Sequence, residues 1–545
     1  MNIHLTREMQ AVVDTTVGRA GVANVAARLW AKDPTLWRPE SAEDQALIAE
    51  RLGWLTSFDD LQPQFADVAA FAEAMAAAGF QKAVLCGMGG SSLAPDMLRT
   101  IFGAARIDVR VLDSTHPAAV RALEAWSNPA ETLYIVASKS GGTVEVLSFF
   151  RYFWAKVAAV KGERAGENFM AITDPDTSLG ALAAERGFRK VFINPPEIGG
   201  RFSALSLFGL VPAALLGIDF VLLAGRASVA AQGWRSVGLL ENGAIWPGLA
   251  LGALAQTGRN KVTFVLDPAI AAFGDWLEQL IAESTGKDGV GLLTVVGELV
   301  RVASAYGDDR VFVYLRLDGS HDAAVQGLID GGQPVLQFDL RDAYDLGAEM
   351  LRWEIATAVA GWVLQINPFD QPNVQSAKTF TKALLANKGA WSLPVAELAV
   401  GDATLPMALA DFLRGCGPGH YVALLVYLPM FAEIMTAIEG LRDALAARTG
   451  AAMTVGYGPR YLHSTGQLHK GGADDGWFIE IVEAGIEHDA LEIPETDDTF
   501  GELVAAQAVG DLQALLAAGR RVLRVAVGRD VVLGINQLTG TVKIS

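Results

Sequence analysis

The chain has 545 residues, a length at which soluble proteins usually divide into about two to four domains. Hydrophobic residues make up 51% of it and charged residues 19%, a composition that can fill large cores and excludes a largely disordered chain. The formal net charge of −18 disfavours nucleic acid or an anionic membrane as a partner unless a local basic patch overrides it. The charge does not define a substrate, because a pocket can be positive on an acidic protein.

The chain has only two cysteines, Cys86 and Cys416, too few for a disulfide framework or a cysteine-rich metal site. Its first residues lack the apolar core of a signal peptide. The longest mostly apolar run, residues 204–218, is interrupted by serine, glycine and proline, and it is too short to span a membrane. We therefore expect a reduced, cytoplasmic protein with no membrane segment and no nucleic-acid partner.

Residues 1–75 are predicted to be a helical segment. Apolar residues recur there at three- and four-residue spacing, for example in 22–29 and 46–55. No group of polar residues with a catalytic pattern occurs in this part of the chain, which indicates a scaffold.

Residues 76–244 alternate short apolar runs with helical stretches, and the runs are predicted strands at 83–86, 109–112, 133–137, 169–173 and 191–194. Continuous apolar strands between helices are typical of a parallel sheet covered on both faces. Right-handed crossovers then place the carboxyl ends of the strands at one edge, where ligands bind in open sheets of this kind.

The same alternation restarts in residues 245–395, with predicted strands at 262–266, 292–296, 311–315 and 335–338. A third α/β stretch occupies residues 396–545, with strands near 422–427, 454–456, 478–482 and 522–527. The pattern leaves open whether this stretch completes the second sheet or forms a layer of its own. The fold class is α/β: two domains with a parallel sheet between helices, a helical N-terminal segment and a C-terminal extension.

A glycine-rich loop, Gly87-Met-Gly-Gly-Ser-Ser92, follows the first predicted strand and directly precedes a helix. Glycines allow close backbone approach, and a helix N-terminus presents free N–H groups to an anion. The loop begins like a dinucleotide fingerprint, but Ser92 stands where the third glycine belongs. A nucleotide site, or simply a tight turn, remains an alternative for this loop taken alone.

A second polar loop, Ser138-Lys-Ser-Gly-Gly-Thr143, lies between the strand at 133–137 and the following helix. Three hydroxyls, a cation and two glycines form a dense set of donors, such as a phosphate monoester requires. The alternative is a helix cap with an incidental lysine. Two such loops at the strand ends of one sheet favour a phosphorylated ligand, and the missing Walker pattern disfavours a nucleoside triphosphate.

These two loops resemble those of the sugar-phosphate-binding SIS domain. Three later segments make the chain similar to the glucose-6-phosphate isomerase family: Gly199-Gly-Arg-Phe-Ser203, Glu283-Ser-Thr-Gly-Lys287 and Phe369-Asp-Gln-Pro-Asn-Val-Gln-Ser-Ala-Lys378. The five motifs stand in the family's order within residues 85–380. The chain also resembles the variant module fused to transaldolase in some bacteria. Transaldolase activity itself is not expected, because the helical leader before residue 85 cannot hold a (β/α)₈ barrel.

The resemblance implies a metal-independent enzyme without a cofactor, a sugar-phosphate substrate, and a homodimer with shared active sites. It places the phosphate-binding residues at Gly90, Ser91, Ser138, Lys139, Ser140 and Thr143, and a glutamine of the sugar site at Gln371. It places the catalytic arginine, base and lysine at Arg201, Glu283 and Lys378.

The chemistry of these side chains suits an aldose–ketose isomerase. One carboxylate must take and return a proton between C2 and C1, and Glu283 lies late in an apolar helix that can partly bury it. Arg201 is suited to stabilising the anionic cis-enediolate, and Lys378 to taking part in ring opening. Each has a structural alternative: Glu283 could pair with Lys287, Arg201 could be an ion-pair partner, and Lys378 could be a solvated helix charge.

The family's catalytic histidine, contributed across the dimer interface, has no counterpart before Phe369 in a matching context. We favour His463 for this role, from a segment whose Thr-Gly-Gln resembles a family loop displaced in order. His469 is the next candidate and a possible substrate ligand, and His321 is the third. A metal site from His463 and His469 fits no standard spacing, although Asp474 and Asp475 are close in sequence. The remaining alternative is a loop that binds phosphate or closes a dimer contact.

The sequence therefore predicts a glucose-6-phosphate isomerase that works through a cis-enediol intermediate. An enzyme that also isomerises mannose 6-phosphate is one alternative, and a non-enzymatic sugar-phosphate sensor is another. The absence of a helix-turn-helix or basic arm, and the presence of Glu283, argue against the sensor.

Overall fold

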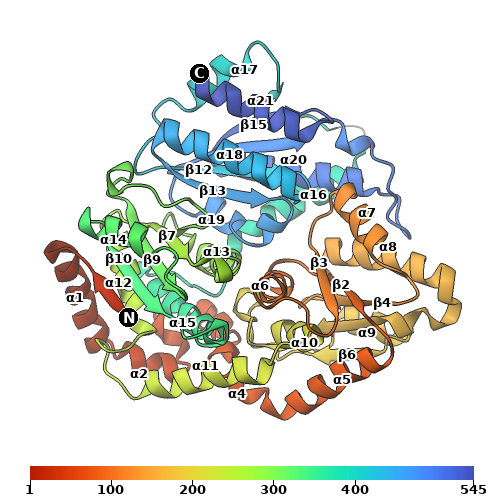
Figure 1. Ribbon diagram of the computed structural model, residues 1–545, viewed down its shortest axis with the longest axis horizontal. Helices are drawn as coiled ribbons and strands as arrows, with labels where there is room; N and C mark the ends of the chain where they lie inside the picture. The colour runs from red at the N-terminus through yellow and green to blue at the C-terminus, as the bar shows by residue number, and fades with distance from the viewer. Residues whose placement is uncertain (389–390, 545) are drawn as a thin grey trace.

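The computed structural model describes residues 1–388 and 391–544, and Figure 1 shows their arrangement. Three five-stranded sheets are present, each with helices on its faces. In the described part of the chain, no helix has the length and apolar character needed to cross a membrane.

The first sheet has the order β3-β2-β4-β5-β6, and all its strands are parallel. Its strands confirm the predicted ones: β2 (Lys82–Cys86), β3 (Asp108–Leu112), β4 (Thr132–Ala137), β5 (Phe169–Thr173) and β6 (Lys190–Ile193). The helices that follow these strands are α6 (Leu93–Phe102), α7 (Pro117–Trp126), α8 (Val144–Lys161), α9 (Ser178–Glu185), α10 (Leu207–Leu216) and α11 (Phe220–Arg235). The prediction of a buried parallel sheet is correct, since every residue of β4 and β5 is buried.

The second sheet has the order β1-β10-β9-β7-β8. The four predicted strands are confirmed as β7 (Lys261–Leu266), β8 (Leu293–Val295), β9 (Arg310–Arg316) and β10 (Val335–Asp339). The prediction missed β1 (Asn2–His4), which pairs antiparallel with β10 and is too short to show an alternating pattern. The helices of this part are α12 (Ile245–Ala255), α13 (Phe273–Thr285), α14 (Asp322–Asp330), α15 (Leu346–Leu364) and α16 (Gln375–Ala386).

The C-terminal stretch forms a sheet of its own, with the order β11-β15-β14-β12-β13, and so answers the question that the sequence left open. Its strands, all parallel, are β11 (Glu397–Ala399), β12 (Tyr421–Tyr427), β13 (Ala452–Tyr457), β14 (Gly476–Glu483) and β15 (Arg521–Val527). Its helices are α17 (Leu405–Phe412), α18 (Ala432–Thr449), α19 (Gly466–Gly471), α20 (Phe500–Ala517) and α21 (Val531–Ile544).

One strand order underlies the three sheets: β3-β2-β4-β5, β8-β7-β9-β10 and β13-β12-β14-β15. In each of these sets of four strands, the strand that comes first in the chain (β2, β7 or β12) has the next strand of the chain on one side and the two strands after that on the other side. This reversal of direction opens a crevice at the carboxyl ends of the strands, where ligands bind in open α/β sheets.

The N-terminal residues form helices, as predicted, but they do not make a separate layer. In Figure 1, α1 (Arg7–Val22) lies beside α12 of the second part, while α5 (Phe65–Ala77) runs along the first. The other helices of this segment are α2 (Val25–Trp30), α3 (Ala42–Ala49) and α4 (Ser57–Asp60). The division of the chain at residues 75, 244 and 395 stays a prediction.

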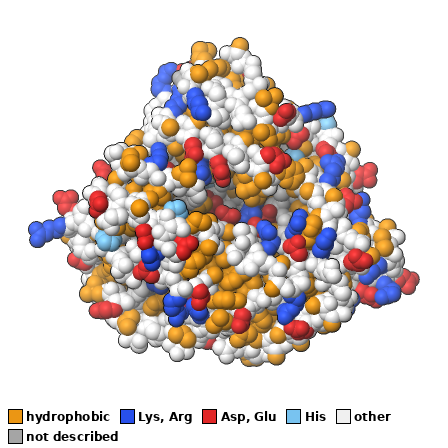
Figure 2. All heavy atoms as spheres, viewed as in Figure 1, with side chains coloured by type: hydrophobic (Ala, Val, Ile, Leu, Met, Phe, Trp, Pro, Cys, Tyr) orange, Lys and Arg blue, Asp and Glu red, His pale blue; other side chains and the backbone are white. Residues whose placement is uncertain are grey.

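The three sheets surround a common centre, with the third at the top of Figure 1 and the other two below it. Figure 2 shows this face hollowed near its centre, where acidic and basic side chains gather. Three elements therefore reach one region: loops that follow strands of the first sheet, loops that follow strands of the third sheet, and the end of α13 from the second part.

Candidate active site

A cavity of about 580 Å³ lies where the three parts meet. Its wall contains most of the predicted site residues: Gly90, Ser91, Ser138, Lys139, Ser140, Thr143, Arg201, Glu283, Gln371, Lys378 and His463. The exceptions are the second and third histidine candidates, His469 and His321. A volume of this size is typical of small-molecule sites.

The predicted phosphate loops form one end of this cavity. Ser138 directly follows β4 and Thr143 is the N-cap of α8, and their hydroxyl oxygens are 3.0 Å apart, so one donates to the other. The loop after β2 packs closely on the turn before Arg201, because a Cβ on Gly90 would lie 1.8 Å from the carbonyl oxygen of Gly200. The hydroxyl-bearing residues Ser138, Ser140 and Thr143 therefore line the cavity next to the N-terminus of α8, an arrangement that suits an anion.

Lys139 has a charge partner that the motif did not predict. Its ammonium contacts the carboxylate of Asp174, which follows β5, and also donates to the carbonyl of Pro196 over 2.9 Å. Burial raises the pKa of the Asp174 carboxyl above its ordinary value, although Lys139 opposes the shift. The lysine is thus already neutralised by a carboxylate that also lines the cavity.

Glu283 and Arg201 face each other in the cavity wall. Glu283 lies in the last turn of α13, and its Oε1 is 3.4 Å from Nη1 of Arg201. Both residues are buried, with 9% and 5% of their surface exposed. A carboxylate and a fixed cation side by side can move a proton and stabilise the anion that the transfer creates.

The guanidinium of Arg201 is held from several sides. Its Nε donates to Ser284 Oγ over 2.7 Å, and its Nη1 donates to Gln371 Oε1 over 3.0 Å. Its Nη2 donates to the carbonyl oxygens of Pro368 and Asp370 over 2.8 Å each. Arg201 thus holds the Phe-Asp-Gln segment against the end of α13.

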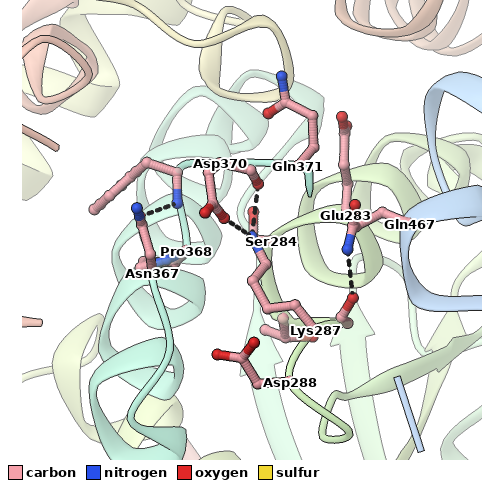
Figure 3. A network of polar contacts seen from close by, with 12 residues as sticks. Glu283, Ser284, Lys287, Asp288, Asn367, Pro368, Asp370, Gln371 and Gln467 are labelled. Carbon is pink, nitrogen blue, oxygen red and sulfur yellow. Dashed lines mark hydrogen bonds and ion pairs between the residues drawn. The ribbon is translucent and has the colours of Figure 1, made fainter. Parts of the chain in front are cut away.

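The alternative pairing of Glu283 with Lys287 is not what the structure shows. In Figure 3 Lys287 reaches Asp370, whose carboxylate and carbonyl oxygens both lie 2.6 Å from its ammonium, while the side chains of Glu283 and Gln371 point away from this ammonium, toward the top of the view. Burial lowers the pKa of Lys287 to about 8, and the nearby charge of Arg201 adds to the lowering. Glu283 therefore pairs with Arg201 and not with Lys287, and it lines the cavity.

His463 enters the cavity from the third part of the same chain, in a short helix, η11 (Arg460–His463), after β13. Its Nε2 lies 3.1 Å from Glu145 Oε1, and this oxygen also accepts a hydrogen bond from Gln507 Nε2 over 2.8 Å. Burial alone raises the pKa of the Glu145 carboxyl, but the charge and hydrogen bond of His463 lower that pKa below its ordinary value. The resemblance implied a histidine from a partner, whereas this one comes from its own chain.

Gly89 marks the point where the three parts touch. It has a φ of +54°, and a Cβ there would lie 2.9 Å from Gln279 Nε2 and 3.0 Å from the carbonyl oxygen of His463. Gln279 Nε2 itself donates to that carbonyl over 2.7 Å and to Glu283 Oε2 over 3.2 Å. One glutamine side chain therefore links the proposed base to the histidine segment.

Arg460, three residues before His463, fixes this segment to the other two parts. Its Nη1 lies 3.1 Å from Asp96 and 3.3 Å from Asp113, both in the first part, and its Nη2 lies 3.5 Å from Asp275 on α13. Arg460 is 9% exposed. A buried guanidinium that bridges carboxylates on separate elements restricts the position of its own loop.

His469, predicted as a substrate ligand, does not line the cavity, so the structure does not bring it together with the other predicted site residues. Its side chain is 1% exposed and packs against Phe478 and Tyr421, with Nδ1 3.2 Å from the Tyr421 hydroxyl. Burial lowers its pKa to about 3, and the charges of Lys470 and Arg520 add to the lowering. His321 precedes α14 and is absent from the cavity wall.

Sequence reasoning missed Glu145 and Gln279. Both could have been found from spacing: Gln279 lies one helical turn before Glu283, and Glu145 lies two residues after Thr143 in the first turn of α8.

Within residues 1–388 and 391–544, no group of three or more His, Cys, Asp and Glu side chains is arranged to hold a metal ion.

Comparisons with known proteins identify the same family as the motifs do. Residues 65–305 match the family model described as phosphoglucose isomerase. Glucose-6-phosphate isomerase of Rubrobacter xylanophilus is 30% identical over 377 residues, which are 58% of this chain and 85% of the relative. The enzyme of the same name from Acholeplasma laidlawii is 30% identical over 353 residues, covering 56% of this chain and 83% of the relative.

Solved structures show the same fold. A hypothetical protein from Thermus thermophilus superposes with a TM-score of 0.60 at 26% identity, covering 71% of this chain and all of the other. A glucose-6-phosphate isomerase from Chlamydia trachomatis superposes with a TM-score of 0.56 at 16% identity, covering 74% of this chain and 89% of the other. The fold is therefore of the SIS type, as predicted. With relatives matched over most of their length, the chain belongs to the glucose-6-phosphate isomerase family.

Proposed function

We propose that this protein interconverts glucose 6-phosphate and fructose 6-phosphate through a cis-enediol intermediate. The observation that carries the proposal is the pairing of Glu283 Oε1 with Arg201 Nη1, 3.4 Å apart, in a cavity that is also lined by two loops suited to phosphate. In this reading Ser138, Ser140 and Thr143, with backbone N–H groups of the α8 N-terminus and the Gly90-Ser91 loop, hold the phosphate.

Ring opening comes first, because sugar phosphates are mostly cyclic in water. It takes a proton from the anomeric hydroxyl and gives one to the ring oxygen, so the number of protons does not change. His463 is the proposed proton donor to the ring oxygen, since it lines the cavity and the Glu145 carboxylate, 3.1 Å from its Nε2, holds the imidazole in place. Lys378 lines the same wall and is the proposed acceptor of the anomeric proton.

Isomerisation then moves a proton between the two carbon atoms. Glu283 takes the proton from C2 of the open-chain aldose, and the electron pair forms the cis-enediolate with its charge on O1. The same carboxyl then returns the proton to C1, while the hydroxyl proton passes from O2 to O1, which leaves the ketose carbonyl at C2. The negative charge that develops on the oxygens lies beside Arg201, whose donors are already fixed by Ser284, Gln371 and two carbonyls. Preorganised charge of this kind lowers the barrier because it needs no reorganisation during the reaction.

The test is the conversion of fructose 6-phosphate to glucose 6-phosphate, coupled to a dehydrogenase. We expect kcat of Glu283→Gln to fall by at least about a hundredfold, because the amide cannot accept the proton. Glu43→Gln, an exposed change of the same type in the first turn of α3, serves as the control. A folded Glu283→Gln variant with full activity would overturn the role of Glu283 but not the reaction.

The same assay separates the other functions. Turnover of mannose 6-phosphate at a comparable kcat/KM would mean a broader isomerase. Wild-type protein that binds fructose 6-phosphate without converting it would be a sensor. A carboxylate and an arginine in contact inside the cavity favour the enzyme, since binding alone has no use for a proton carrier.

Assembly and location are further parts of the proposal. The resemblance favours a homodimer in the cytoplasm, and a size measurement at working concentration tests the dimer. Because His463 and Glu283 belong to one chain, we propose that each chain holds a whole site. Mixing the inactive variants Glu283→Gln and His463→Asn should then restore no activity, whereas sites shared between subunits would regain a part of it.

A further inference from the structure

An arginine of the N-terminal segment lines the cavity, although no motif marked it. Arg51 lies between α3 and a short helix, η2 (Gly53–Leu55), and it is half-buried in the cavity wall. We propose that Arg51 binds the phosphate group of the substrate. This inference rests on the proposed function, since it adds a binding residue to the same site.

The backbone beside Arg51 is anchored to the first part of the chain. Leu52 forms an isolated antiparallel bridge with Ile198, and the N–H of Gly53 donates to the carbonyl of Glu197 over 3.0 Å. A Cβ on Gly53 would lie 3.0 Å from the Cβ of Glu197, so the two backbones touch. The segment that carries Arg51 is therefore held at the edge of the cavity.

Aromatic packing fixes the same segment next to the catalytic arginine. Trp54, completely buried, stacks on Phe202 with ring centroids 5.0 Å apart, and Phe202 follows Arg201 in the chain. The Arg51 side chain passes over Gly199, with Cδ 3.9 Å from where a Cβ would stand. Burial lowers the pKa of the Arg201 guanidinium, and the charge of Arg51 adds to this lowering, as expected for two cations held near each other.

Two cations of the cavity wall are already paired with carboxylates. Lys139 is engaged by the carboxylate of Asp174, and Arg201 faces Glu283. Among the described residues, the Arg51 side chain donates to the carbonyl oxygen of Glu50 over 3.0 Å and has no carboxylate within ion-pair distance. Within this part of the chain, Arg51 thus brings a positive charge that no ion pair compensates.

The position of this charge favours the phosphate over the sugar ring. Asp174 lies beside Lys139 in the predicted phosphate end, and although burial raises the pKa of Asp174, the charge of Arg51 opposes that shift together with Lys139. The positive charge of Arg51 therefore acts on the end of the cavity where the charges of Lys139 and Asp174 cancel each other. A phosphate dianion there gains a partner whose forked donors match two of its oxygens.

The test compares Arg51→Gln with Arg51→Lys and with the control Arg7→Gln, an exposed arginine in the same segment. For Arg51→Gln we expect the KM for fructose 6-phosphate and the inhibition constant of inorganic phosphate to rise about tenfold, with kcat within about twofold of wild type. The inhibition constant of sorbitol, which has no phosphate, should not change. Arg51→Lys should lie between wild type and Arg51→Gln, and Arg7→Gln should match wild type.

Two results would overturn the inference: unchanged inhibition by phosphate in folded Arg51→Gln, or equal weakening of phosphate and sorbitol, which would place Arg51 at the sugar. Failure of the proposed function looks different. If the wild type converts no sugar phosphate, but phosphate binding measured by calorimetry still weakens in Arg51→Gln, the isomerase is wrong and the phosphate ligand stands.

Discussion

The phosphate loops of the first sheet and the His463 segment of the third face one cavity, but they are placed by different means. The hydroxyls of Ser138 and Thr143 are set by a strand end and a helix start within six residues of chain. His463 is set by partners more than 180 residues away in sequence, Glu145 at its imidazole and Gln279 at its carbonyl. A binding loop can thus be local, whereas this catalytic group depends on the packing of three parts.

The largest expected effect concerns the residue placed at long range. His463→Asn should lower kcat by about a hundredfold or more, because ring opening loses its proton donor while phosphate binding stays intact. Glu145→Gln should have an effect of the same order, and the double variant little more, since the two act as one unit. His321→Asn is the control. A His463→Asn variant that changed KM alone would mean that this side chain only binds.

The local loop should behave in the opposite way. Thr143→Ala removes one hydroxyl donor, so KM for fructose 6-phosphate should rise about tenfold and kcat should change much less. Thr143→Ser retains the hydroxyl and should stay close to wild type. Steady-state kinetics with phosphate as a competitive inhibitor distinguishes the two. A loss in kcat equal to the loss in kcat/KM would contradict the assignment of this loop to binding.

A smaller effect is expected where the histidine segment is fixed. Arg460→Lys keeps the charge but cannot reach Asp96, Asp113 and Asp275 with a forked guanidinium, so His463 should be held less firmly. We expect kcat to fall about threefold, with a displaced pH–rate profile and an unchanged inhibition constant for phosphate.

Arg99→Lys is the matched control for Arg460→Lys, since Arg99 also pairs with Asp96, at 2.9 Å, but belongs to the same helix as its partner. Equal pH–rate profiles for the two variants would show that Arg460 contributes to stability without positioning His463.

The smallest effect on activity should be that of His469, which shares a segment with His463 but not its role. Burial lowers the pKa of His469 to about 3 in the folded protein. As pH falls below the ordinary histidine value, the unfolded chain therefore binds a proton at this side chain that the folded chain does not bind. This makes the protein less stable as pH falls, by at most about 1.4 kcal/mol per pH unit.

His469→Gln, which stays neutral, should keep full activity and remove that part of the slope. Urea unfolding at about pH 7, 6 and 5 measures it. An unchanged dependence of the free energy of unfolding on pH would mean that His469 is protonated in the folded protein. A loss of activity would mean that His469 belongs to the active site.

Much of the fold could be predicted from the sequence because it depends on local patterns. Apolar runs between helices correctly predicted the strands of all three sheets, except the short strands β1 and β11, which have three residues each. Strand order cannot be read from such runs, so the independence of the third sheet was not predicted.

By itself, the sequence determined the α/β class, the family resemblance and the residue types of the two phosphate loops, because these depend on short stretches of chain. Only the tertiary structure decided which carboxylates face which cations: Arg201 faces Glu283, while Lys287 binds Asp370. It also decided between two histidines six residues apart, since His463 emerges at the cavity and His469 turns into the core. The physical reason is that charge pairing and burial depend on contacts between distant segments, which spacing along the chain does not encode.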